Sequence, residues 1–179
     1  MAEQQAETRE QQFARVRAYL LAQGEKLSPA EIVEKVRESQ GTVLAAAGRV
    51  PAARLGKAPA AGEWSVAEVL QHVIGSGAGV GRRIVETVEQ RQAAPALFED
   101  RLEHNGADLS LARARELLLA EREALFAAAV AADPAAHLDQ AAIEHQWFGP
   151  LNWKAALLFL RVHDLDHARQ IDAIAAQGA

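Results

Sequence analysis

The chain has 179 residues, a net charge of −5 at pH 7, no cysteine and an aromatic content of 5%. This length predicts a single domain over residues 1–179. The lack of cysteine excludes disulfides, thiolate zinc sites and cysteine nucleophiles, and the negative charge argues against a nucleic-acid partner. No apolar segment reaches membrane-spanning length, and the N-terminus lacks the features of a signal peptide. We therefore expect a soluble cytoplasmic protein.

The composition predicts an all-α fold. Alanine, leucine, arginine and glutamate are abundant, and no segment alternates apolar and polar residues for long enough to indicate a strand. The periodic residues 2–23 predict an additional N-terminal helix within residues 1–25, ending near Gly24. The apolar face of this helix over residues 13–20 is expected either to dock on its own bundle or to pair with a second subunit in a homodimer.

Two capping boxes mark the next helix starts. Ser28 is followed three residues later by Glu31, and Ser65 is followed three residues later by Glu68. In this pattern the hydroxyl and the carboxylate each accept a hydrogen bond from a free backbone N–H of the first turn. One helix is expected from residue 29 to about Pro51, and another from residue 66 to about residue 90.

The glycine-rich second half of that helix is expected to be buried against a close neighbour. Residues 91–108 then form a connection long enough to cross from one end of a bundle to the other. Ser110 is expected to cap a helix to about Ala132, residues 133–151 are expected to form a loop, and Asn152 is expected to cap a last helix over residues 153–176.

His163 and His167 lie on the apolar stripe of the last helix. Because four residues make slightly more than one turn, both imidazoles project from the same face about 6 Å apart, within reach of one metal ion. The simpler interpretation is one core histidine and one partly exposed histidine, each with a hydrogen-bond partner. His72 would add a third imidazole if its helix packs beside the last one, which spacing alone does not establish.

Three segments resemble the DinB/YfiT-like family, which is distinct from the DNA polymerase that shares the DinB name. Residues 62–73 read GEWSVAEVLQHV, residues 147–151 read WFGPL and residues 162–171 read VHDLDHARQI. The capped Trp-Ser…His and the HxxxH motif occur in the family's order and at suitable spacing. The resemblance covers residues 28–175 and leaves the N-terminal helix as an addition.

The resemblance implies a four-helix bundle with a long crossover between bundle helices 2 and 3, for which residues 91–108 are long enough. It also implies a divalent metal ion bound by His72, His163 and His167. Three neutral protein ligands leave coordination positions for water or substrate, as in catalytic rather than structural sites. Imidazole ligands suit zinc, nickel and iron about equally, so the metal's identity stays open.

Glu68 and Gln170 are each one turn from a predicted ligand. Glu68 has two interpretations, contact with the ion or the capping-box role, and we favour the cap. Gln170 is expected either to orient an imidazole or to face the pocket.

Four residues in or near the last helix complete the candidate site. Asp164 and Asp166 are expected on a solvated face, with Asp164 the better candidate for an outer-shell contact to His167. His145 and Trp147 precede the helix and are expected at the mouth of the pocket.

The resemblance leaves several functions open. Relatives include transferases and isomerases that use the thiols bacillithiol or mycothiol, and in such a mechanism a metal-bound small thiol would become a thiolate nucleophile. The absence of cysteine means that the thiol would have to come from a cosubstrate. The alternatives are a hydrolase that uses metal-bound hydroxide with Glu68 as acid or base, a non-catalytic metal-binding or stress-response bundle, and a bundle whose histidines hold no metal.

Overall fold

The computed structural model describes residues 8–90, 97–98 and 109–177. Their secondary structure is predominantly α-helical, which confirms the expected all-α class. A short 3-10 helix, Ala52–Arg54, follows the second α-helix. The α-helices of the described residues are α1 (Arg9–Lys26), α2 (Pro29–Gly48), α3 (Val66–Val88), α4 (Leu111–Ala131) and α5 (Trp153–Ala176).

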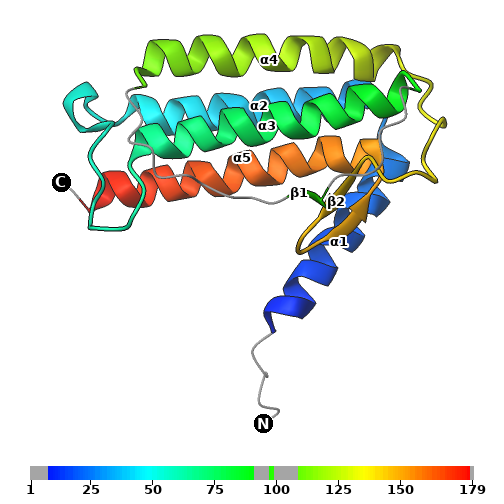
Figure 1. The fold of residues 1–179 in the computed structure, drawn as a ribbon, viewed down its shortest axis with the longest axis horizontal. Helices are drawn as coiled ribbons and strands as arrows, with labels where there is room; N and C mark the ends of the chain where they lie inside the picture. The colour runs from blue at the N-terminus through cyan, green and yellow to red at the C-terminus, as the bar shows by residue number, and fades with distance from the viewer. Residues whose placement is uncertain (1–7, 91–96, 99–108, 178–179) are drawn as a thin grey trace.

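Helices α2 to α5 form the bundle, and α1 leaves one end of it at an angle (Figure 1). The colours of Figure 1 show that α3 and α4 run in one direction, whereas α2 and α5 run in the other. Because α3 and α4 run in the same direction, the end of α3 and the start of α4 lie at opposite ends of the bundle. The predicted crossover, residues 91–108, lies outside the described residues except for positions 97–98.

Both predicted capping boxes are present. The Glu31 carboxylate accepts a hydrogen bond from the Ser28 backbone N–H at 2.8 Å, and the Glu68 carboxylate accepts one from the Ser65 backbone N–H at 2.7 Å. Helices α2 and α3 therefore begin where the sequence predicts. They end two or three residues earlier than expected, at Gly48 and Val88.

Helix α1 does not end near Gly24, as predicted, but continues to Lys26. Gly24 is buried where α1 crosses α5, and a Cβ atom there would lie 3.3 Å from the Ala155 backbone nitrogen. The glycine therefore allows two helices to approach closely instead of stopping one. Phe13 and Val16 pack on the apolar core, so this face docks on its own bundle. The homodimer stays a prediction.

Three very short strands, which the sequence did not indicate, form a small sheet at the α1 end of the bundle (Figure 1). Strand β2 (Ile143–His145) pairs antiparallel with β3 (Gly149–Leu151) and parallel with β1 (Leu97–Phe98). Strands of two or three residues are too short to show a period of two, so their pairing depends on tertiary contacts. The sheet places His145 against the bundle.

The buried apolar residues form two clusters, separated along the bundle by a polar layer. On α5 the first cluster includes Leu160 and the second begins at Ala168. The polar residues between them are buried and come from all four bundle helices. They are Ser39 and Gln40 of α2, His72 of α3, Arg122 of α4, and His163, Asp164 and His167 of α5.

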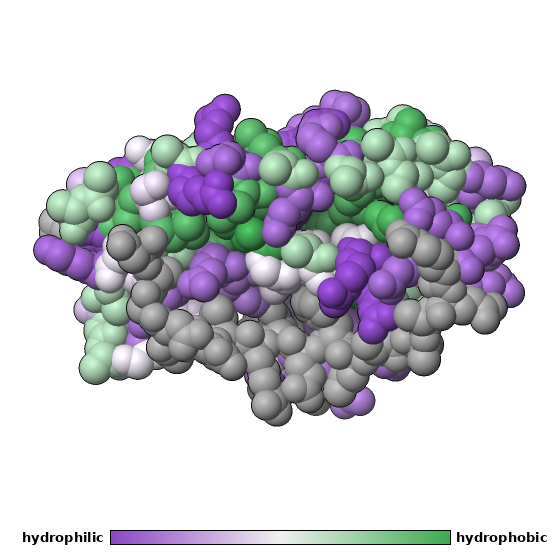
Figure 2. Space-filling view, turned by 45° about the horizontal axis from the view of Figure 1, so that its top comes forward, coloured by the Kyte–Doolittle hydropathy of each residue, from purple (hydrophilic) through white to green (hydrophobic). Residues whose placement is uncertain are grey.

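On the face drawn in Figure 2, hydrophilic side chains are interspersed with apolar ones. The exposed large hydrophobic residues of the described chain are spread over several elements, including Tyr19 on α1 and Val130 on α4. Among the described helices, none combines the length and the apolar character that a membrane-spanning segment needs.

Candidate metal centre

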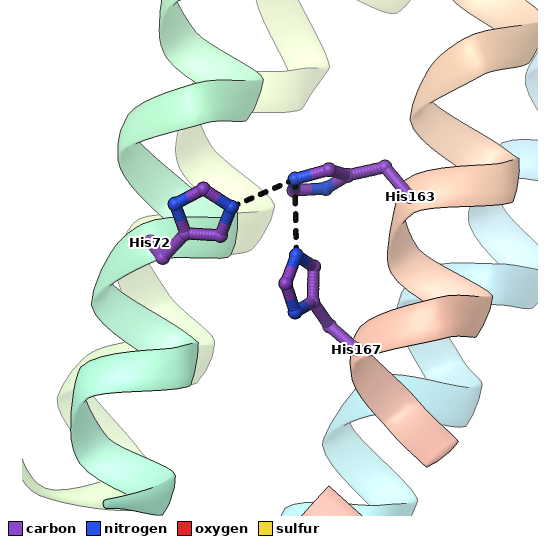
Figure 3. A group of neighbouring side chains, drawn as sticks. All are labelled: His72, His163 and His167. Atoms are coloured by element: carbon purple, nitrogen blue, oxygen red, sulfur yellow. Dashed lines mark hydrogen bonds between the residues drawn. The ribbon is translucent and has the colours of Figure 1, made fainter. Parts of the chain in front are cut away.

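The structure brings His72, His163 and His167 together. Figure 3 shows the His72 ring reaching from α3 toward the two rings of α5. The Nε2 atom of His163 lies 3.0 Å from that of His72 and 3.2 Å from that of His167. The three side chains are only 5%, 6% and 9% exposed. Three ring nitrogens of the same kind therefore converge inside the bundle.

These separations fit a shared metal ion. Bonds of about 2.0–2.1 Å place two nitrogen ligands of one ion roughly 2.8–3.4 Å apart, depending on the coordination angle. The donor set of three neutral imidazoles suits zinc, nickel or iron. The three histidines are thus a group that could hold a metal ion.

Gln170 orients one of these imidazoles. Its Oε1 atom lies 2.8 Å from Nδ1 of His167. An amide oxygen only accepts hydrogen bonds, so Nδ1 donates its proton, and the neutral ring keeps its lone pair on Nε2, toward the other histidines. The Ser76 hydroxyl lies 3.3 Å from Nδ1 of His72, where it can accept a hydrogen bond from the ring N–H, and 3.4 Å from Nε2. These contacts are of the kind that orients metal ligands.

Two aromatic residues that the sequence analysis did not assign to the site lie against the triad. The Trp64 ring centroid is 5.3 Å from that of His72 and 6.3 Å from that of His167. Phe159 is 5.6 Å from His163 by the same measure. Phe159 precedes His163 by four residues, so helical spacing could have identified it. Trp64 entered the sequence analysis only as part of the motif over residues 62–73.

Glu68 has the capping role that the sequence favoured. Its Oε2 atom accepts hydrogen bonds from the backbone N–H and the hydroxyl of Ser65, both at 2.7 Å. It is not a member of the metal-binding group found among the described residues.

Asp164 departs most from its prediction. It was expected on a solvated face, with an outer-shell contact to His167, yet it is fully buried and turned toward α4. Both of its carboxylate oxygens pair with Arg122, at 2.7 and 2.8 Å, and one also accepts a hydrogen bond from Ser39 at 3.0 Å. Asp166 is exposed, as expected.

Arg122 was not predicted as a partner of Asp164, although the sequence contains a signal for its burial. Arg122 follows Leu118 by four residues and precedes Leu125 by three, so it interrupts the apolar stripe of α4. Gly77 makes room for it on α3, because a Cβ atom there would lie 3.0 Å from the guanidinium. The expected close packing of the α3 glycines is thus confirmed at Gly77.

A cavity of about 930 Å³ lies beside the triad and is lined in part by His163 and His167. His145 and Trp147 both line it, as the sequence predicted. His145 is 2% exposed, with Nδ1 3.2 Å from the backbone nitrogen of Trp147, whereas Trp147 is 46% exposed. His163 and His167 therefore face a cavity large enough for a small-molecule ligand.

The sequence was compared with protein families and with known proteins. The family model of the DinB superfamily matches residues 35–171, which include all three histidines, Asp164 and Gln170, but not α1. No curated protein and no solved structure matches the sequence significantly. The match covers most of the chain and agrees with the bundle and its three-histidine group: the chain belongs to the DinB superfamily.

Proposed function

We propose that this protein is a metal-dependent enzyme that transfers or isomerises its substrate with the help of a low-molecular-weight thiol. The observation that carries the proposal is the convergence of three imidazole Nε2 atoms beside a cavity of about 930 Å³. His72, His163 and His167 would hold a divalent zinc, nickel or iron ion. Such an ion would supply Lewis acidity, which lowers the pKa of a thiol that binds it.

The residues around the triad have separate roles in this proposal. Gln170 fixes the ring of His167, and Trp64 packs over His72 and His167. The thiol must come from a cosubstrate because the chain has no cysteine. Its sulfur would form a bond to an electrophilic carbon of the second substrate, the bond from that carbon to its leaving group would break, and the leaving group would depart with the bonding electron pair. The thiol proton would pass to solvent.

The structure gives less support to the hydrolase alternative. Hydrolysis needs a general acid or base near the triad, and Glu68 was predicted from the sequence as the candidate for this role. Its Oε2 atom already accepts two short hydrogen bonds from Ser65. A carboxylate bound in this way stabilises the helix start rather than accepting a proton from water. We therefore favour the thiol-dependent reaction.

Cobalt-substituted protein tests the proposal directly. Cobalt(II) adopts the same kind of site as zinc and absorbs visible light, so a thiolate that binds it produces a sulfur-to-cobalt charge-transfer band. We expect this band when (4-mercaptophenyl)acetate is added to the wild-type protein. The corresponding phenol is the matched control and should leave the spectrum without the band.

Two results would contradict the proposal. Cobalt that is bound stoichiometrically but gives no sulfur band with any thiol would exclude direct thiol binding. Ester or amide hydrolysis that needs no thiol and is lost in Glu68→Gln would favour the hydrolase. His163→Ala should abolish both cobalt binding and the band, whereas His137→Ala, a change in the loop after α4, should abolish neither.

A further inference from the structure

Helix α1 lies outside the residues that match the DinB superfamily, yet it forms one wall of the cavity beside the triad. Arg9, Phe13 and Val16 of α1 line the cavity together with His163 and His167. The part of the chain that the family match leaves out therefore contributes to the candidate site. This wall is where the chain's own ligand preference can arise.

The α1 wall is built around an aromatic stack. The rings of Phe13 and Trp147 are parallel within 2°, with centroids 5.4 Å apart, and Phe148 meets Phe13 edge-on at 5.5 Å. The Arg9 guanidinium carbon lies 5.4 Å from the Phe13 centroid and 5.6 Å from that of Trp147. These cation–π contacts hold the Arg9 charge beside a flat apolar surface.

The cavity is more positive than the protein as a whole. Its lining includes Arg9, Arg161 and Arg169, and its only acidic lining residue among those described is Asp166. Asp166 lies 3.7 Å from Arg169, and both side chains are 76% exposed. Within the described chain no ion pair involves Arg9 or Arg161. Two arginines of the described lining thus have no acidic partner in the described part of the chain, in a protein whose net charge is −5.

We infer that the cavity binds an organic anion with a flat apolar body, and that α1 helps to select it. The body would lie against Phe13 and Trp147, and its carboxylate would pair with Arg9 and Arg161. The inference rests on the proposed function in one respect only, the contact between one end of the ligand and the histidines. It assigns to α1 a role in specificity in addition to its packing on α5.

Binding of two isosteric probes to the zinc-loaded full-length protein tests this inference. Phenylacetate and phenylacetamide have nearly the same shape but differ in charge, and ligand-observed NMR or calorimetry gives their affinities. We expect phenylacetate to bind at least tenfold more tightly. Arg9→Gln and Arg161→Gln should each reduce that preference several-fold. Arg15→Gln, also on α1 but outside the cavity lining, is the matched control and should leave it unchanged.

Three results would overturn the inference. They are equal binding of the two probes, no binding of either probe, and a preference for phenylacetate that survives both arginine changes. In the last case the zinc ion itself would be holding the carboxylate, and the preference would disappear in His163→Ala.

The cobalt experiment separates this inference from the proposed function. If phenylacetate is preferred through Arg9 and Arg161 but no thiol gives a sulfur band, the thiol reaction fails and the anion site stands. If (4-mercaptophenyl)acetate and 4-methylbenzenethiol give the band at the same concentration, and the arginine changes have no effect, thiol binding stands and the anion site fails.

Discussion

Two polar clusters lie on neighbouring faces of α5, and they differ in how their atoms are paired. Toward α4, the Asp164 carboxylate is satisfied by Arg122 and Ser39 through three hydrogen bonds. Toward α3, the Nε2 atoms of the three histidines point at one another beside an open cavity. In the first cluster the carboxylate is paired within the protein, although Nε of Arg122 is buried without a hydrogen-bond partner, whereas the second cluster has the donor arrangement of a cation site.

The difference shows that burial of polar groups does not by itself indicate function. Asp164 is more deeply buried than any of the histidines, yet its partners identify it as part of the bundle's internal structure. Breaking each cluster should therefore affect a different property, stability for one and metal binding for the other.

The largest expected effect is on stability. Asp164→Asn removes the charge opposite Arg122 and should lower the free energy of unfolding by about 3–5 kcal/mol, because it leaves a buried guanidinium without its counter-ion. Urea denaturation measures the change. Asp166→Asn, two residues away but exposed, is the matched control and should stay within about 0.5 kcal/mol of wild type. Similar losses in the two variants would contradict the structural role of Asp164.

His163→Ala should act on the other cluster. Its Nε2 atom lies within 3.2 Å of the Nε2 atoms of both other histidines, so its loss should reduce metal affinity by roughly 100-fold or more, since even outer-shell partners contribute about 10–100-fold. Elemental analysis and competition with a chelator give the stoichiometry and affinity. Retention of one tightly bound ion per chain in this variant would show that the histidines are core residues.

Gln170→Leu should weaken metal binding by about 10–100-fold, because it removes the acceptor that fixes the His167 ring. Gln170→Glu keeps an acceptor at the same position and should restore most of the affinity. The same chelator competition measures both. Equal affinities in the leucine and glutamate variants would mean that the contact at 2.8 Å does not orient the ligand.

Glu68→Ala distinguishes the cap from the metal site. It should cost about 1 kcal/mol in the free energy of unfolding, through loss of the capping box, and leave one metal ion per chain. Ser28→Ala, which alters the equivalent box on α2, provides a comparison of the same kind at a distance from the histidines. Loss of metal from Glu68→Ala alone would make Glu68 a ligand.

The smallest effect concerns Lys154, a buried charged residue of α5 like Asp164. Burial lowers the pKa of its amino group, so folding disfavours the protonated form. Wild-type stability attributable to this group should therefore rise as pH increases from the lowered pKa toward the usual value of 10.5. Lys154→Met should stabilise the protein by about 0.5–1 kcal/mol at neutral pH. Thermal unfolding at several pH values should show this advantage shrinking in alkaline solution.

Local patterns in the sequence predicted the helix starts and part of the site. The caps at Ser28 and Ser65 depend on residues three positions apart, and the facing of His163 and His167 depends on one helical turn. The participation of His72 depends on the contact between α3 and α5. Spacing could not predict that contact, and only the family resemblance indicated it.

The wrong predictions share a physical cause. Helical geometry correctly predicted that the Asp164 side chain points away from those of its sequence neighbours. The group that Asp164 contacts, Arg122, lies 42 residues away in the sequence. Gly24 has a low helix propensity, and the close approach of α1 to α5 outweighs it. In both cases a contact between distant segments decided an outcome that local preference could not.

The contact between α2 and α5 has a consequence for how the protein folds. The first and last bundle helices form an extensive interface between residues 29–48 and 153–176. Such distant contacts raise the contact order and slow folding relative to bundles whose successive helices pair. His72 and His163 are 91 positions apart, so during synthesis the three-histidine group cannot assemble until the last helix has left the ribosome.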